Sequence, residues 1–170
     1  MCSSDLAYSR AGENARVADL LPEALPAARE ALPGDSPQLA GVLAAGGLAL
    51  LKLKKWDEAE PLLRESLTIR AKQQPDAWST FNANSMLGGA LLGRKKYAEA
   101  EPLLLKGYQG MKARERTIPK QGGGELRIPE ALDRLVELYT AINKPDEAKK
   151  WRAERAKYPE AKKAAAPEKK

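Results

Sequence analysis

Apolar and polar residues recur with helical spacing through most of this chain of 170 residues. From Ala98 to Arg114 the apolar or small positions follow one another three or four residues apart, at Ala100, Leu103, Leu104, Gly107, Tyr108 and Met111. A stripe with this spacing covers one face of an amphipathic helix. Similar spacing predicts six more helices, over residues 13–32, 38–54, 57–73 and 78–93 and from residues 129 and 143 onward.

Prolines, glycines and acidic residues set the expected ends of these helices. The segment 33–37 (Pro-Gly-Asp-Ser-Pro) ends the first helix, in which Pro22 predicts a kink or a later start because an interior proline lacks an N–H donor. Asp57 is expected as the N-cap of the third helix, with Glu60 three residues later. The glycine-rich stretch 117–124 predicts a longer, flexible loop.

The helical pattern is itself repeated. Trp-Asp-Glu-Ala-Glu-Pro-Leu-Leu begins at residue 56, and Tyr-Ala-Glu-Ala-Glu-Pro-Leu-Leu begins at residue 97, which is 41 positions later. A third, delayed copy is marked by Glu147-Ala148, which lies 48 positions after Glu99-Ala100. Helical repeats of this length indicate a stack of helix hairpins in which no single unit buries its own apolar face. The sequence therefore predicts an all-α fold of about seven helices.

We expect the chain to divide into three hairpins with flanking segments. The segments are 1–12, disordered or non-native; 13–35, the last helix of an incomplete preceding repeat; 36–73, hairpin 1; 74–116, hairpin 2; 117–125, the glycine-rich loop; 126–158, hairpin 3 and C-terminal cap; and 159–170, a disordered basic tail. Translation of a common sequencing-adapter DNA would give the string Cys2 to Leu6, so the true protein is expected to continue upstream.

Composition excludes several kinds of chemistry. The chain has no histidine, and its one cysteine is Cys2. Disulfide frameworks, zinc sites of Cys and His, and catalytic triads are therefore excluded. Carboxylates remain, but the pairs at Asp57-Glu58 and Glu99-Ala100-Glu101 are explained as acids that favour the starts of helices. We expect a protein that is not an enzyme and that needs no cofactor and no metal.

The net charge of +6 is concentrated at the end of the chain. Residues 144–170 carry ten Lys or Arg and five Asp or Glu, which leaves +1 for residues 1–143. One interpretation is a basic surface on the last helix and tail that binds nucleic acid or membrane. The other is a charged cap with a solubilising tail, which the interleaved acids Glu154, Glu160 and Glu168 favour. With no apolar run long enough to cross a bilayer and no signal-like start, we expect a cytoplasmic protein.

With these residues in view, the chain resembles a tetratricopeptide-repeat array of the long-repeat type found in kinesin light chains. That family places small residues where the two helices of a hairpin cross, a bulky residue beside them and another in the turn. The resemblance implies a right-handed α-solenoid whose defining packing positions are Gly47, Leu50, Trp56, Ala59, Gly88, Leu91, Tyr97, Ala100, Tyr139 and Ala148. Arg152 and Arg155 depart from the pattern, as the polar outer face of a terminal cap would require.

A narrower resemblance concerns the segments 87–93, 101–108 and 151–159. They are similar to the C-terminal repeat region of planctomycete-type bacterial Ser/Thr protein kinases. That resemblance implies a kinase domain upstream of this chain, because none of the catalytic motifs of a kinase occurs in it.

By analogy with the repeat family, we expect the first helix of each hairpin to line a concave groove that holds a protein or peptide partner and no small-molecule substrate. The expected groove residues are Leu48, Lys52, Asn82, Ser85, Met86, Gly89, Asp133, Arg134 and Glu137, with Ala44, Ala45 and Glu130 at neighbouring positions. Asn82 offers both a donor and an acceptor to a peptide backbone, and Gly89 lets that backbone approach. The alternative is that these residues are simply solvated helix faces.

Overall fold

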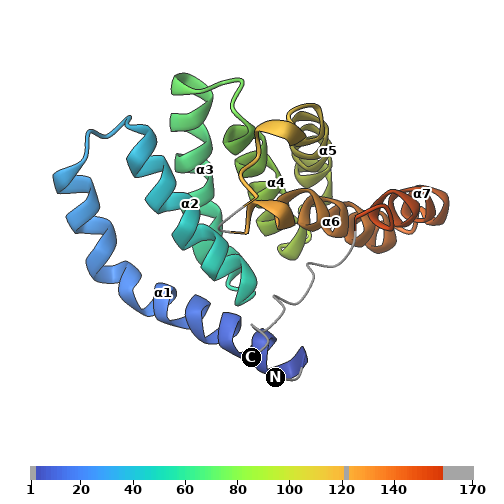
Figure 1. Cartoon of the computed structure of the whole chain (residues 1–170), viewed down its shortest axis with the longest axis horizontal. Helices are drawn as coiled ribbons and strands as arrows, with labels where there is room; N and C mark the ends of the chain where they lie inside the picture. The colour runs from blue at the N-terminus through green and yellow to red at the C-terminus, as the bar shows by residue number, and fades with distance from the viewer. Residues whose placement is uncertain (1–2, 121–122, 159–170) are drawn as a thin grey trace, which may run out of the picture.

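The computed structural model describes residues 3–120 and 123–158 (Figure 1). Seven α-helices lie within this part: α1 (Ser3–Ala31), α2 (Pro37–Lys52), α3 (Trp56–Gln73), α4 (Trp78–Gly93), α5 (Tyr97–Ala113), α6 (Arg127–Ala141) and α7 (Pro145–Arg155). Two short 3₁₀ helices, η1 (Glu115–Thr117) and η2 (Gly124–Leu126), connect α5 to α6. No strand occurs in the described ranges. The predicted all-α solenoid is confirmed.

The helices pack as three successive hairpins, α2 with α3, α4 with α5, and α6 with α7. Each hairpin also contacts the next, through α3 on α4 and α5 on α6, and the first helices α2, α4 and α6 touch one another in that order. Helix α1 packs on α2, and Figure 1 shows α1 and α7 at opposite ends of the array. The stack therefore has one side formed by α2, α4 and α6.

The three hairpin turns share one backbone geometry. Lys54, Lys95 and Asn143 have left-handed φ values of 60°, 61° and 55°. In each turn the following N–H reaches back to a carbonyl five residues earlier, and the N···O distance is 2.9 Å from Lys55, Lys96 and Lys144 alike. This is the Schellman arrangement that closes the C-terminus of a helix. The repeat seen in the sequence is therefore also a repeat of turn geometry.

The expectation that Asp57 is an N-cap is wrong. Helix α3 already begins at Trp56, with Lys55 as its N-cap, so Asp57 lies inside the first turn. The reason is that the tight turn leaves only Leu53 to Lys55 between the helices, and Lys55 completes the turn and starts α3 at once. Asp57 still lies where a negative charge favours the helix dipole.

Helix α1 differs from the expectation in two ways. It begins at Ser3, so residues 3–12 are helical rather than disordered, and it continues through Pro22 and Pro26 instead of starting near Pro22. Both prolines are exposed and lie four residues apart, and each removes one backbone donor from α1. Leu21 and Leu25, each the residue before a proline, pack against the core, which keeps the helix continuous along the bent path seen in Figure 1.

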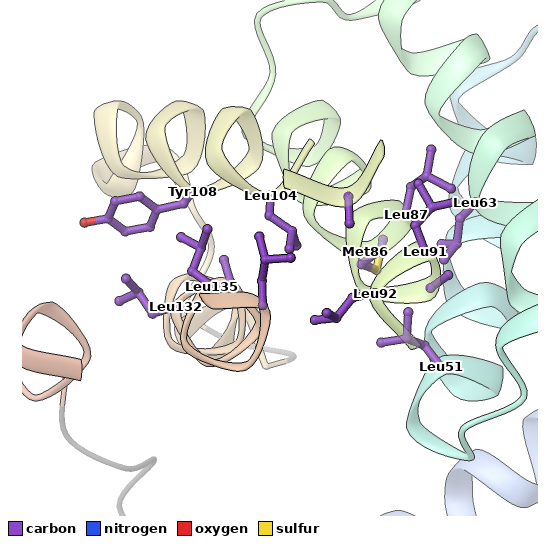
Figure 2. Close-up of a cluster of buried hydrophobic side chains, with 14 of the residues drawn as sticks. Leu51, Leu63, Met86, Leu87, Leu91, Leu92, Leu104, Tyr108, Leu132 and Leu135 are labelled. Carbon is purple, nitrogen blue, oxygen red and sulfur yellow. The ribbon is translucent and has the colours of Figure 1, made fainter. Parts of the chain in front are cut away.

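Small residues set the distance between the two helices of a hairpin. A methyl group on Gly47 would lie 2.5 Å from Leu63 Cδ2, and one on Gly88 would lie 2.7 Å from Leu104 Cγ. Both leucines are fully buried. Figure 2 shows the buried core between hairpins, where α4 contributes Met86, Leu87, Leu91 and Leu92 between Leu51 and Leu63 on one side and Leu104, Tyr108, Leu132 and Leu135 on the other.

Neighbouring hairpins are also joined by equivalent ion pairs. Lys96 Nζ lies 3.6 Å from Glu60 Oε2, and Lys144 Nζ lies 4.0 Å from Glu101 Oε1. In each case an acid in the first turns of a second helix reaches the turn of the next hairpin. The Tyr139 hydroxyl also donates to Glu101 Oε1 at 2.8 Å. The step from one hairpin to the next is therefore held by polar contacts as well as by the core.

The connection between α5 and α6 contains more structure than the expected loop 117–125. Thr117 ends η1, Gly124 begins η2, and Ile118 is buried between them. Helix α6 begins at Arg127, two residues before the expected start at Pro129, and α7 ends at Arg155.

The expected disordered tail, 159–170, lies outside the described residues. None of the described helices is long and apolar enough to cross a membrane.

Candidate functional site

A cleft of about 160 Å³ lies where the three hairpins meet. It is lined by the end of α2 (Leu51, Lys52), the first residue of α3 (Trp56), the last turns of α4 (Gly89, Leu92) and one face of α6 (Glu130, Asp133, Arg134, Glu137). The residues of α6 are spaced by three and four, so the helix turns a single stripe toward the cleft. All three hairpins therefore contribute to this one site.

The inner wall of the cleft is apolar. Leu51 and Leu92 are the residues that follow the repeated Leu50 and Leu91, and they are 8% and 5% exposed. Trp56 is half-buried, and its ring lies so close to Gly93 that a side chain there would overlap it. The wall thus offers aliphatic and aromatic surface.

Arg134 crosses the cleft from α6 to α4 and is 7% exposed. Its Nη1 donates to Ser85 Oγ at 3.0 Å, and its stem passes Gly89 so closely that a methyl group on Gly89 would lie 2.9 Å from Arg134 Cδ. Burial lowers the pKa of the guanidinium, and the charge of Glu130 acts against this shift. An arginine stays charged after such a shift, so Arg134 is a fixed cation in the cleft.

Glu130 forms ion pairs with the cations of the site. Its carboxylate lies 2.7 Å from Lys52 Nζ, 3.2 Å from Arg127 Nη1 and 3.8 Å from Arg134 Nη2. Burial acts to raise the pKa of Glu130, but the charges of Arg134, Lys52 and Arg127 together lower it more, so the net shift is downward. Glu130 is therefore ionised near neutral pH, and it is the counter-ion of both basic residues that line the cleft.

The other two carboxylates are open to solvent. Asp133 accepts from Arg155 Nε at 2.7 Å, and its side chain is 58% exposed. Glu137 is also exposed, and it makes no hydrogen bond or ion pair with any residue in the described ranges. The rim of the cleft on the α6 side is therefore acidic.

The structure brings together five of the expected groove residues, namely Lys52, Gly89, Asp133, Arg134 and Glu137. It places Asn82, Ser85 and Met86 in the interior instead, at 8%, 0% and 2% exposed, and Leu48 half-buried against the core. The reason is that α6 packs directly on α4, and Arg134 covers Ser85. The neighbouring position Glu130 lines the cleft, whereas Ala44 and Ala45 do not.

Sequence reasoning did not assign Leu51 and Leu92 to the site, and it gave Trp56 a packing role only. A signal was present, because Leu51 and Leu92 are the same residue at equivalent positions of two repeats, one place beyond the core stripe. Of the expected packing positions, Ala59, Ala100 and Ala148 are at most 1% exposed. The ten packing positions remain predictions as determinants of the repeat.

The described residues hold no cluster of three or more acidic or cysteine side chains suited to a metal ion. Two of the three carboxylates that line the cleft, those of Glu130 and Asp133, pair with cations.

Comparison with known proteins gives one family match. Residues 39–72 match the tetratricopeptide repeat, and these residues span nearly all of the α2–α3 hairpin. No curated protein matches the chain. Repeats of this kind generally mediate contacts between proteins. The match at residues 39–72, together with the same hairpin geometry in α4–α5 and α6–α7, supports a protein of the tetratricopeptide-repeat type.

Proposed function

We propose that this chain is a non-catalytic scaffold that holds a protein or peptide partner in the cleft between α2, α4 and α6. The observation that carries the proposal is that three hairpins combine an apolar wall with a charged rim at one place. Its volume of about 160 Å³ is below the roughly 300–1,000 Å³ typical of small-molecule sites. The cleft therefore suits one anchoring side chain of a larger partner.

We also propose that the chain serves as the recruiting arm of a larger cytoplasmic protein such as a Ser/Thr kinase. The resemblance of residues 87–93, 101–108 and 151–159 to kinase-associated repeats supports this context. The reading frame upstream of the gene segment tests it. A kinase domain in that frame is the expected result, and an unrelated domain or a stop codon would contradict it.

The alternative function, binding of nucleic acid or membrane through α7, gains no support from the described contacts. Lys150, Arg155 and Lys157 pair with Glu147, Asp133 and Glu154. Cations that are held by neighbouring acids offer little charge to phosphates. Arg152 donates to Thr140 and Lys149 is exposed, and neither of these two cations has an ion pair with the described residues. We therefore propose binding in the cleft and not on α7.

The test is selection of binders from a random displayed peptide library on the immobilised chain. Asn82 and Arg134 are buried, so blocking variants are better placed at Glu137, which is exposed and unpaired among the described residues. Glu137→Trp covers the rim with a large ring, and Glu30→Trp on the exposed side of α1 is the matched control. We expect selected peptides to bind the wild type and Glu30→Trp equally and to lose affinity for Glu137→Trp. Equal binding to both variants would exclude the cleft.

A further inference from the structure

We propose that the cleft selects an extended segment that carries one apolar side chain next to a lysine or arginine. The inference rests on the proposed function and specifies the partner: the apolar group fills the space between Leu51, Trp56 and Leu92, and the cation pairs with Glu137 at the rim. Three observations support this inference: the size of the cleft, the pairing of its cations, and the carboxylate of Glu137, which has no partner among the described residues.

The size of the cleft fits one apolar group. A cavity of roughly 150 Å³ lined by aliphatic and aromatic residues holds a benzene molecule. At about 160 Å³, this cleft has room for a side chain of the size of leucine or phenylalanine. The stem of Arg134 covers Gly89, so Leu51, Trp56 and Leu92 are the apolar surface that is left for this side chain.

The basic residues of the cleft are already neutralised. Lys52 Nζ lies 2.7 Å from Glu130, and Arg134 lies between Glu130 and Ser85 with little exposure. An acidic partner would have to compete with Glu130 for Lys52 in order to pair with it. An anion at this rim would also approach Asp133 and Glu137, which repel it.

The acidic residues at the rim, in contrast, can each pair with a further cation. Asp133 accepts one bond from Arg155 and is more than half exposed, and Glu137 has no partner among the described residues. Asp133 and Glu137 lie one helical turn apart on α6, so a single cation can approach both carboxylates. Charge complementarity therefore favours a basic group beside the anchored apolar one.

The experiment selects displayed peptides with one fixed leucine and random flanking positions, using the full chain. We expect enrichment of lysine or arginine next to the leucine. A selected peptide is then titrated by calorimetry against wild type, Glu137→Gln and Glu137→Lys, with Glu30→Gln and Glu30→Lys as matched controls. Its Kd should rise about two- to fivefold for Glu137→Gln, as for an exposed ion pair, and further for Glu137→Lys. Salt should weaken binding to the wild type more than binding to Glu137→Gln.

Two results would overturn the inference. The first is a set of peptides that lose affinity for Glu137→Trp yet show no basic preference and bind Glu137→Gln as tightly as the wild type; the proposed function would then stand without this specificity. The second concerns the chain's own tail, which carries Lys162 and Lys163. If replacing both lysines with alanine tightens peptide binding tenfold or more, the tail and not a partner segment is the occupant. We expect no such change.

Discussion

Gly88 of α4 lies directly on Leu104 of α5. A methyl group on Gly88 would meet Leu104 Cγ at 2.7 Å and its backbone nitrogen at 3.2 Å. Gly47 and Leu63 make the same contact one repeat earlier. Each of them lies 41 residues before its counterpart in the second hairpin. The crossing of the helices is thus defined by a contact that only glycine permits, because a larger residue would force the helices apart.

Replacing Gly88 with alanine is therefore expected to destabilise the fold by about 1–3 kcal/mol, the usual cost of overpacking a core. The free energy of urea-induced unfolding measures the effect. Gly41→Ala is the matched control, because the nearest atom to its added methyl group is Arg70 Nη2 at 4.0 Å. There alanine should stabilise by up to about 1 kcal/mol, since it favours the helix and restricts the unfolded chain. Equal effects at both sites would contradict this account of the crossing.

The hairpin turns give a second prediction. Lys95 has a φ of 61°, a conformation that costs a residue with a side chain about 1–2 kcal/mol. Glycine adopts it freely but loses more entropy on folding, so Lys95→Gly should stabilise by about 0.5–1 kcal/mol. Thermal unfolding reports the change. Lys149→Gly, in the exposed middle of α7, should have the opposite sign, and a loss of stability at both positions would argue against the strained turn.

Glu60 should make stability depend on pH. Burial acts to raise its pKa, but hydrogen bonds and charges from Arg64 and Arg94 outweigh burial, and the pKa falls below its ordinary value of 4.5. A carboxyl with a lowered folded-state pKa contributes fully above its unfolded-state pKa, and the contribution is lost as pH falls through the folded-state value. Glu60→Gln should therefore cost about 1–3 kcal/mol at neutral pH and progressively less in acid.

Urea unfolding of wild type and Glu60→Gln at a series of pH values from neutral to acid measures this difference. Glu30→Gln serves as the control, because Glu30 is exposed and forms no ion pair with the described residues. Its effect should be small at every pH. If the difference in unfolding free energy between wild type and Glu60→Gln stayed constant down to strongly acid pH, the Glu60 carboxylate would not be the source of the pH dependence.

Arg134 and Ser85 give a fourth prediction, through their coupling. The buried guanidinium donates to Ser85 Oγ at 3.0 Å and lies 3.8 Å from Glu130. Arg134→Ala should cost about 2–4 kcal/mol, because packing is lost and Ser85 is left without its donor. A double-mutant cycle with Ser85→Ala should show a coupling of about 0.5–3 kcal/mol. Strict additivity would mean that the hydrogen bond contributes nothing.

The assignment of Gly47 and Gly88 to the helix crossings followed from the resemblance to the repeat family and remains a prediction. The positions and the order of the helices were readable from the sequence alone, and helix α4 was predicted with its observed bounds, Trp78 to Gly93. These features are local, because helical periodicity and short turns depend on residues a few positions apart. The same helices and turns then recur in each repeat.

The tertiary structure decided which residues of the expected groove are open. Asn82 and Ser85 are both buried, and Arg134 of α6 donates to Ser85 and enters the space beside Gly89. It also decided that α1 continues through Pro22, since packing of Leu21 holds the helix together. Periodicity states which face a residue takes, but exposure depends on how closely the next hairpin approaches. That distance is set by side chains from α4 and α6 packing together, which no local pattern contains.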